Sequence, residues 1–597
     1  MHAITIVIGS ICILAITYRF YGIFMANKVL RLNDETATPA HTLQDGKNYV
    51  PTNRWVVFGH HFAAIAAAGP LVGPVLAAQF GYLPGLLWLL IGAVIGGAVH
   101  DMVILYASMR HKGQSLSEVA KKELGPVAGF CTGLAMLFII TITMAGLSMV
   151  VVNALANNPW GTFTVLMTIP IAMAVGLYYK KTGNLKIAST VGFLLVVLAV
   201  FIGPYIQNTG LGHLLTLDIK TLSLLLPAYA FFAAALPVWL LLTPRDYLSS
   251  FMKIGVFAAL IIGVFMINPL IRMPLTTAFT AGGGPVIAGP VWPFISITIA
   301  CGAISGFHAF ISSGTTPKML DRWTDIKMVG FGAMLVECLV GIMALIAATA
   351  LHPADYFAIN ALPEVFKTLG MNVVDLPHLN NEIGLALEGR PGGAVTLAVG
   401  MTYIFTTIKW FANLAPYFFQ FVILFEAVFI LTAVDAGTRV ARYLIQDFFG
   451  EFYKPLKQVN WLPGSIFASL LACFLWGYLL YSGDISSIWV LFGVSNQLMA
   501  SIGLIVGATF VLKIATKRRY MMTCIIPLAY LYVTVNTAGY WMITHVYLNP
   551  QSPGYNLVNA TLSIIMLVLG LVIMVAAIKK WIEMWQTPRL EFDEAVS

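Results

Sequence analysis

Long apolar segments alternate with short polar loops along the whole chain. Most of these segments approach the length of about 20 residues that a helix needs to cross ~30 Å of hydrocarbon. The pattern predicts fifteen membrane-spanning helices. Their boundaries lie near 2–25, 55–79, 85–108, 126–150, 160–179, 187–206, 221–242, 254–270, 291–311, 328–351, 416–434, 462–481, 488–511, 521–543 and 557–578. We therefore expect an all-α polytopic membrane protein with the lipid bilayer as its environment.

Composition supports this fold class. Hydrophobic residues make up 59% of the 597 positions and charged residues only 10%, which is far less charge than a soluble protein of this length carries. The net charge of +8 reflects basic loops and does not indicate nucleic-acid binding. The six cysteines stand singly in apolar stretches, a pattern typical of packing residues and not of disulfides or metal ligands.

Basic residues separate the loops into two sets. One set carries most of the Lys and Arg, whereas the other carries only Lys220, Arg272, Lys367 and Arg390. The positive-inside rule then places the N-terminus outside and the C-terminus in the cytoplasm. The acidic flank 352–393 lies outside and the basic flank after 434 lies inside, so an odd number of crossings connects them. We expect a half-helix or surface helix at 394–412 and a full span at 416–434.

Glycine–proline pairs interrupt the second span. Gly69-Pro70 and Gly73-Pro74 lie four residues apart within it. Proline in a helix removes a backbone hydrogen bond at a cost of about 3 kcal/mol, and in lipid the freed carbonyls need partners. A packed kink is one interpretation. We favour a helix that is broken at a binding site.

Prolines also interrupt the seventh span, at Pro227 and Pro237. This span lies five spans after the second and crosses in the opposite direction, and corresponding interruptions in two inverted halves point to a transporter site. The pattern predicts a first inverted repeat at 55–206 and a second at 221–434, which includes the outward loop 352–393. Outside this core lie the N-terminal helix and cytoplasmic loop (1–54), the accessory C-terminal helices (462–578) and a cytoplasmic tail (579–597).

The ninth span is rich in small and hydroxyl-bearing residues. Ser305, His308 and Ser312 fall on one face of the helix. Hydroxyls beside freed carbonyls hold a sodium ion or relay a proton, whereas small residues also serve to pack helices together. Opposite the break in the second span, we favour ion coupling.

Ionisable residues inside spans are functional candidates because each costs ~3 kcal/mol or more in lipid. They are His100 and Asp101 in the third span, His308 in the ninth, Glu337 in the tenth and Glu426 in the eleventh. Structural pairing between helices is the equal alternative for each of them. Two further pairs predict a gate or an interfacial salt bridge near the cytoplasmic ends of spans: Arg245 with Asp246, and Asp435 with Arg439.

Two adjacent histidines open the second span. His60 and His61 are of a type that binds zinc, as are His100 and Asp101. Adjacent side chains point about 100° apart on a helix, so both histidines bind one ion only if the helix is distorted.

Several motifs together resemble the carbon starvation protein A family, over about residues 50 to 515. They are Asn53–Trp55, Gly59–Ile65, Gly69–Ala77, Pro237–Trp239, Pro244–Leu248, Ser305–His308, Ser312–Lys318, Leu424–Ala427, Asp435–Arg439 and Leu491–Gln497. The resemblance implies a secondary transporter of peptides, or of pyruvate in some members. It also implies a five-plus-five fold of LeuT type within the amino acid–polyamine–organocation superfamily.

The resemblance also suggests roles for individual residues. It implies that Gly69, Pro70, Gly73, Pro237, Trp239, Ser305 and His308 lie around the substrate, and that Ser312 and Ser313 lie near a coupling sodium or its proton substitute. Two features depart from the family pattern: His100 stands before Asp101 where glutamine is expected, and the outward loop 352–393 is shorter than in some members.

The function predicted from the sequence is import of short peptides across the bacterial inner membrane, driven by a proton or sodium gradient. Pyruvate/proton symport is the alternative within the family, and a nutrient receptor or channel is a second alternative. A channel predicts a continuous polar pore, whereas the spans show isolated polar patches. No nucleophile–base pair or HExxH motif indicates an enzyme, and no cofactor is expected beyond the coupling ion. The oligomeric state stays open.

Overall fold

The computed structural model describes residues 1–46, 49–66, 69–182, 184–235, 242–408, 411–450, 453–458, 461–483 and 485–586. These residues form helices and loops, with two isolated bridges and no strand among them. The predicted all-α membrane fold class is confirmed. By length and hydropathy, eleven of the described helices are able to cross a membrane, or twelve if one bent pair is counted as a span.

The main helices are α1 (Ala3–Phe24), α3 (Arg54–Ile65), α4 (Gly69–Ala77), α5 (Tyr82–Ile91), α6 (Ala98–Arg110), α7 (Leu116–Leu124), α8 (Pro126–Leu155), α9 (Pro159–Thr182), α10 (Leu185–Gln207), α12 (Ile219–Ala235), α13 (Leu242–Ile267), α14 (Val291–Thr298), α15 (Phe307–Gly314), α16 (Ala333–Ala350), α20 (Ala394–Thr406), α21 (Ala415–Gly450), α22 (Leu462–Ser482), α23 (Ile485–Ile514), α24 (Met522–Met542) and α25 (Leu557–Gln586). A π-helical turn, Gly92–Gly97, joins α5 to α6, and another, Lys327–Gly332, leads into α16.

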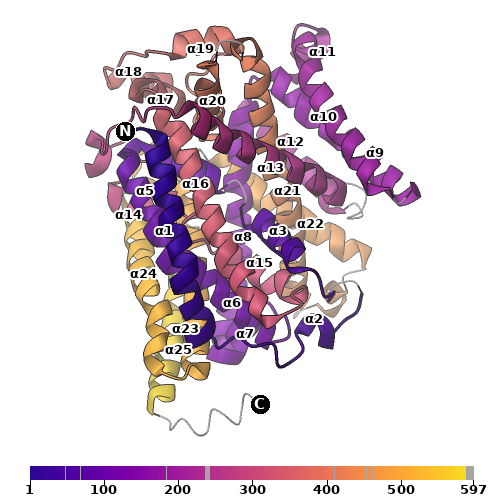
Figure 1. Cartoon of the computed structure of the whole chain (residues 1–597), viewed down its shortest axis with the longest axis vertical. Coiled ribbons are helices and arrows are strands. Elements are labelled where there is room, and N and C mark those ends of the chain that lie inside the picture. Colours follow the sequence, from indigo (N-terminus) through magenta and orange to yellow (C-terminus); the bar gives the residue numbers. More distant parts are fainter. Residues whose placement is uncertain are drawn as a thin grey trace.

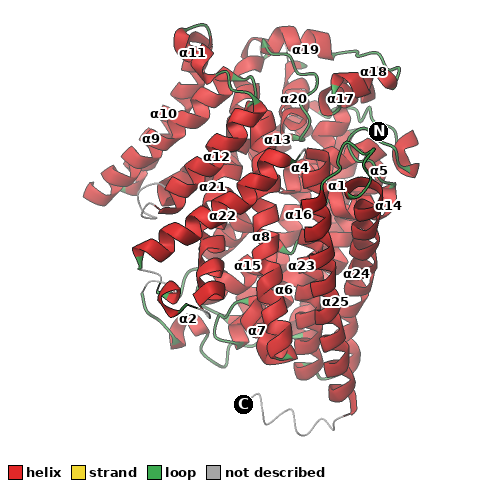
Figure 2. Cartoon of the chain, turned by 180° about the vertical axis from the view of Figure 1, so that it is seen from behind, coloured by secondary structure: helices red, strands yellow, loops and turns green. Residues whose placement is uncertain are grey.

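The long helices run roughly parallel, and short helices cover the two ends. The N-terminus lies at the same end as α17 (Pro353–Asn360), α18 (Pro363–Thr368) and α19 (Leu376–Ile383), while α2 (Pro39–Thr42) and α7 lie at the other (Figure 1). Seen from behind, α9 and α10 lean outward on one side and α24 and α25 form the opposite edge (Figure 2). Helices α8, α16, α21 and α23 are largely buried, so they form the centre of the protein.

The second span is broken, as predicted. Helix α3 and the segment Gly69–Phe80 are bent by 45° at residues 66–68, of which 67 and 68 lie outside the described part of the chain. Gly69-Pro70 begins α4, where a proline has no intrahelical hydrogen bond to lose, and Pro74 lies inside α4. The break therefore precedes the two Gly-Pro pairs and does not lie between them.

The ninth span is also broken, which corrects the continuous helix predicted at 291–311. Helix α14 ends at Thr298 and α15 begins at Phe307, with Gly302 in the left-handed region (φ 87°) between them. Two indole N–H groups satisfy carbonyls that the break frees. Trp88 donates to the Ile299 oxygen (3.0 Å) and Trp489 to the Thr298 oxygen (3.4 Å).

The two breaks pack against each other. A Cβ atom on Gly69 would lie 2.4 Å from Cys301 Cβ, and one on Gly73 would lie 2.6 Å from the Thr298 carbonyl oxygen. Real Cβ contacts are not this short, so glycine is required where α4 meets residues 298–301. The seventh span is not interrupted at Pro227, which lies inside α12, and this corrects that part of the prediction. Helix α12 ends at Ala235 and α13 begins at Leu242, and Pro237 and Trp239 lie outside the described residues.

Helix α20 confirms the prediction of a short helix before the eleventh span. It has 13 residues and is about 20 Å long, which is too short to cross the hydrocarbon. Fewer than the fifteen predicted helices are long and apolar enough to cross a membrane. The three predicted spans that are missing correspond to short, interrupted or partly described helices, at 221–242, 254–270 and 291–311.

Candidate ion-coupling and substrate site

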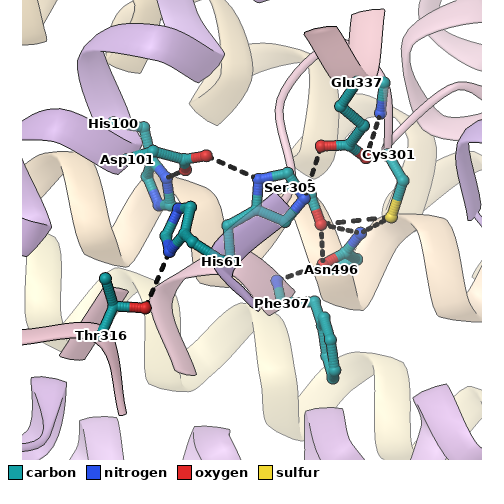
Figure 3. A network of polar contacts seen from close by, with 11 residues as sticks. His61, His100, Asp101, Cys301, Ser305, Phe307, Thr316, Glu337 and Asn496 are labelled. Atoms are coloured by element: carbon teal, nitrogen blue, oxygen red, sulfur yellow. Dashed lines mark hydrogen bonds and ion pairs between the residues drawn. The ribbon is translucent and has the colours of Figure 1, made fainter. Parts of the chain in front are cut away.

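A network of buried polar side chains lies beside the two breaks (Figure 3). It brings together helices α3, α6, α15, α16 and α23 with the unwound segment 299–306. Its ionisable members are His61, His100, Asp101, His308 and Glu337, and each is exposed by 1% or less. Charges in such a place persist only if they are paired and hydrogen-bonded.

His308 lies between two carboxylates that come from different helices. Its Nδ1 is 2.8 Å from Asp101 Oδ2 on α6, and its Nε2 is 3.1 Å from Glu337 Oε2 on α16. The contact with Asp101 is a hydrogen bond, whereas the contact with Glu337 is at ion-pair distance and is not a hydrogen bond. The geometry therefore suits one positive charge held between two negative ones, and we name this group the Asp101–His308–Glu337 triad.

The remaining oxygens of the triad connect it to its surroundings. Asp101 Oδ1 is 2.8 Å from His100 Nδ1. Glu337 Oε1 accepts a hydrogen bond of 3.1 Å from the backbone N–H of Gly302, in the unwound segment. Glu337 thus connects α16 directly to the break between α14 and α15.

Asn496 on α23 caps the second half of the broken ninth span. Its Oδ1 accepts from the Phe307 N–H (2.8 Å) at the start of α15, and its Nδ2 donates to Ser305 Oγ (3.0 Å). Its own carbonyl oxygen accepts from the Gly306 N–H (3.1 Å). These are hydrogen bonds that the first turn of a helix lacks otherwise.

The two adjacent histidines diverge. His61 is buried, with Nδ1 2.8 Å from Thr316 Oγ1, whereas His60 is exposed. Among the described residues, no group of three or more His, Cys, Asp or Glu side chains is arranged to hold a metal ion. The zinc site considered from the sequence gains no support from this arrangement.

Neither of the two serines predicted near a coupling ion is hydrogen-bonded to the triad. Ser313 Oγ accepts a hydrogen bond from the Leu116 N–H (3.1 Å) and donates one to the Ala309 carbonyl, so it connects α15 to α7. Ser312 is buried, and its hydroxyl has no hydrogen-bond partner among the described residues.

A second buried cluster joins three helices at the predicted gate. Tyr229 of α12 donates to Asp435 Oδ2 of α21 (2.8 Å), and Arg245 of α13 contacts both, with 3.4 Å from its Nη1 to the same carboxylate oxygen. Arg439 donates to the Ala233 carbonyl at the C-terminal end of α12 (3.2 Å), a position where a cation is favourable. The backbone of Asp246 lies in α13, but its side chain is outside the described part of the structure.

The comparison with known proteins decides the family. Residues 2–538 match the family model described as carbon starvation protein CstA.

The chain belongs to the CstA family.

Curated relatives cover nearly the whole chain. The peptide transporter CstA of Bacillus subtilis is 76% identical over 596 residues, which is 100% of both chains. The pyruvate/proton symporter BtsT of Escherichia coli is 42% identical over 601 residues (93% of this chain, 83% of the relative). The peptide transporter CstA of E. coli is 43% identical over 577 residues (90% and 81%). A solved manganese transporter of Eremococcus coleocola aligns over 91% of this chain and 99% of its own at 12% identity, with a TM-score of 0.47.

In this CstA-family protein the structure brings together six of the predicted site residues. They are His61, His100, Asp101, Ser305, His308 and Glu337. Glu426 stands alone on α21, buried, with no hydrogen-bond partner for either carboxyl oxygen among the described residues. Asn496 and Thr316 were not predicted as site residues, although they lie in the family motifs Leu491–Gln497 and Ser312–Lys318.

Proposed function

We propose that this protein is a proton-coupled secondary transporter that imports short peptides across the bacterial inner membrane. The observation that carries the proposal is the Asp101–His308–Glu337 triad, buried where two broken helices meet. The names of the relatives support the substrate, since a peptide transporter is 76% identical to this chain over its full length.

We infer fifteen crossings, with α12, α13 and the α14–α15 pair added to the twelve candidate spans. The N-terminus is then periplasmic and the C-terminus cytoplasmic, as the basic loops indicate. Six crossings separate the two broken spans, so they run in opposite directions. We therefore propose inverted repeats of LeuT type that begin at α3–α4 and at α14–α15, in place of the pairing of the second and seventh spans.

Proton coupling follows from the contacts of Glu337. When Glu337 carries a negative charge, it is held by His308 and by the Gly302 N–H. A proton on Glu337 removes that charge, so the ion pair with His308 is lost and the hydrogen bond from the Gly302 N–H is weakened, because hydrogen bonds to charged groups are the stronger ones. The segment 299–306 is then released from α16, and the two broken helices are free to separate.

Peptide binding requires that separation. The N-terminal end of α4 begins at Gly69, and a helix N-terminus favours a carboxylate such as the one that ends a peptide. In this conformation Gly69 is covered by Cys301 and α15 is capped by Asn496. We propose that Gly69, Pro70 and Gly73 become accessible to substrate only when α4 moves away from the unwound segment, and that the cluster of Arg245, Tyr229 and Asp435 gates this movement.

The test is uptake of labelled dipeptides and labelled pyruvate into proteoliposomes under an imposed pH gradient or sodium gradient. We expect dipeptide uptake that follows the pH gradient. Pyruvate uptake that excludes dipeptides would favour the second candidate function, pyruvate/proton symport, which the 42% identity to BtsT supports. Absence of gradient-driven uptake of either substrate would contradict a secondary transporter.

A further inference from the structure

An apolar groove opens on the outside of the helix bundle between α1, α3 and α16. Both α1 and α3 pack against α16, and Figure 1 shows α1 and α16 side by side. The groove has a volume of about 390 Å³, and its lining includes Ile11, Ala15, Phe58, Met328 and Leu339. From Met328 to Leu339 the lining follows eleven helical steps, or about 16 Å, which is close to the thickness of one hydrocarbon leaflet.

Cations gather at one end of this groove. Lys327 Nζ lies 4.4 Å from the ring centroid of Tyr18, and Arg54 Cζ lies 5.8 Å from that of Trp55. Both aromatic rings line the groove. Arg19 follows Tyr18 on α1 and is close enough to Lys327 for their charges to repel.

The positive charge at this end is not neutralised by ion pairs. Within the described part of the chain, Arg19, Arg54 and Lys327 form no ion pair within 4 Å. Asp325 interacts with Arg54 at longer range and offsets part of its charge. Tyrosine and tryptophan beside such cations are typical of the boundary between hydrocarbon and head groups.

We propose that this groove binds one anionic phospholipid of the cytoplasmic leaflet, with an acyl chain along α1 and α16 and the phosphodiester between Arg54 and Lys327. The proposal depends on the proposed orientation, which places this end of the groove at the cytoplasmic surface. An apolar groove alone fits any lipid tail, and the unpaired cations select the anionic head group.

Binding at this position would affect the broken second span. Arg54 is the first residue of α3, and the Asn53 side chain caps that helix by accepting from the Trp55 N–H (2.9 Å). A phosphate there also benefits from the positive end of the α3 dipole. The lipid would therefore hold α3 at the membrane surface while α4 moves.

Thermal unfolding of the full-length protein tests the proposal. The purified protein is titrated in detergent with phosphatidylglycerol or with phosphatidylcholine of the same acyl chains, and Tm is followed. We expect phosphatidylglycerol to raise Tm at lower concentration than phosphatidylcholine. In the double variant Arg54→Gln/Lys327→Gln, the concentration needed should increase by roughly 30-fold, because each cation near an anionic head group contributes roughly fivefold.

Two further variants distinguish the contribution of the cations from that of the apolar groove. Lys122→Gln removes an exposed lysine on α7, away from the groove, and should respond to both lipids as the wild type does. Ala15→Phe fills the groove on the lipid-facing side of α1 and should weaken the response to both lipids, with the cations intact. Native mass spectrometry should find one phosphatidylglycerol retained by the wild type and lost from the double variant.

Three results would overturn the proposal: equal responses to the two lipids, an unchanged response in the double variant, or the same rise in Tm with inorganic phosphate alone. None of these measurements depends on transport, so a failure here is distinct from a failure of the proposed transport function.

Discussion

The two buried glutamates of the central helices have opposite surroundings. Glu337 on α16 accepts a hydrogen bond from the Gly302 N–H at Oε1, and its Oε2 lies at ion-pair distance (3.1 Å) from His308 Nε2 without a hydrogen bond. Glu426 on α21 is equally buried, but neither of its oxygens has a hydrogen-bond partner among the described residues. Burial alone marks both residues as unusual in a membrane. The partners distinguish them, because only Glu337 is connected to a segment of backbone that is broken.

The largest effect is expected from removal of the shared cation. His308→Ala leaves Asp101 and Glu337 buried without the charge between them, and breaking a buried ion pair costs about 3–5 kcal/mol. Thermal unfolding should show a large drop in Tm. The double variant His308→Ala/Glu337→Gln removes one of the two stranded charges and should recover part of the loss. A single variant as stable as the wild type would show that the triad is not charged.

Glu426→Gln tests the buried glutamate that has no hydrogen-bond partner. A neutral amide replaces a carboxyl group that has no partner to lose. We therefore expect the free energy of unfolding, followed by thermal unfolding, to stay within about 1 kcal/mol of the wild type or to rise. Peptide uptake driven by a pH gradient should fall by a few-fold at most. Loss of all gradient-driven uptake would instead make Glu426 the principal proton carrier.

A smaller loss is expected at the cap of the broken helix. Asn496→Ala removes the acceptor of the Phe307 N–H, and loss of an N-cap costs about 1 kcal/mol. Ser305→Ala removes the hydroxyl that is bonded to the Asn496 side-chain N–H but leaves the acceptor of the Phe307 N–H in place, so it serves as the matched control. Equal Tm values for Asn496→Ala and the wild type would mean that this cap does not stabilise α15.

The smallest effect concerns a carboxylate at the edge of the membrane. Burial raises the pKa of Glu123 on α7, but hydrogen bonds and charges from His111 (3.0 Å) and Lys513 (3.5 Å) outweigh it and hold the pKa below its usual value. The resulting stabilisation is complete above the unfolded pKa of about 4.3 and is lost as the pH falls toward the lower folded value.

The Tm difference between wild type and Glu123→Gln should therefore be constant near pH 6 and shrink below about pH 4.3. A difference that grows as the solution is acidified would have the wrong sign for this account.

Local features made the second break predictable. Pro70 favours the start of a helix, so the Gly-Pro pair at 69–70 predicts an interruption there, whereas Pro74 lies inside α4. Ionisable residues in apolar segments identified Asp101, His308 and Glu337 individually. The break in the ninth span was missed because its stabilising groups are distant in sequence. Trp88 and Trp489 cap the α14 carbonyls and Asn496 caps α15, each from about 190 residues or more away. No periodicity within 291–311 carries that information.

Three predicted roles stay predictions. Pro237 and Trp239, predicted near the substrate, lie beyond the described residues, and the side chain of Asp246, predicted at the gate, is not described. The divergence of His60 and His61, in contrast, follows from helix geometry alone, since adjacent residues point about 100° apart.

The most direct test of the central claim is dipeptide uptake by Glu337→Gln in proteoliposomes. Glutamine has the same shape and still accepts from the Gly302 N–H, but it cannot exchange a proton. We predict a folded protein that equilibrates labelled dipeptide across the membrane and no longer accumulates it under a pH gradient, while the wild type does. Gradient-driven accumulation by Glu337→Gln at the wild-type level would contradict proton coupling through the Asp101–His308–Glu337 triad.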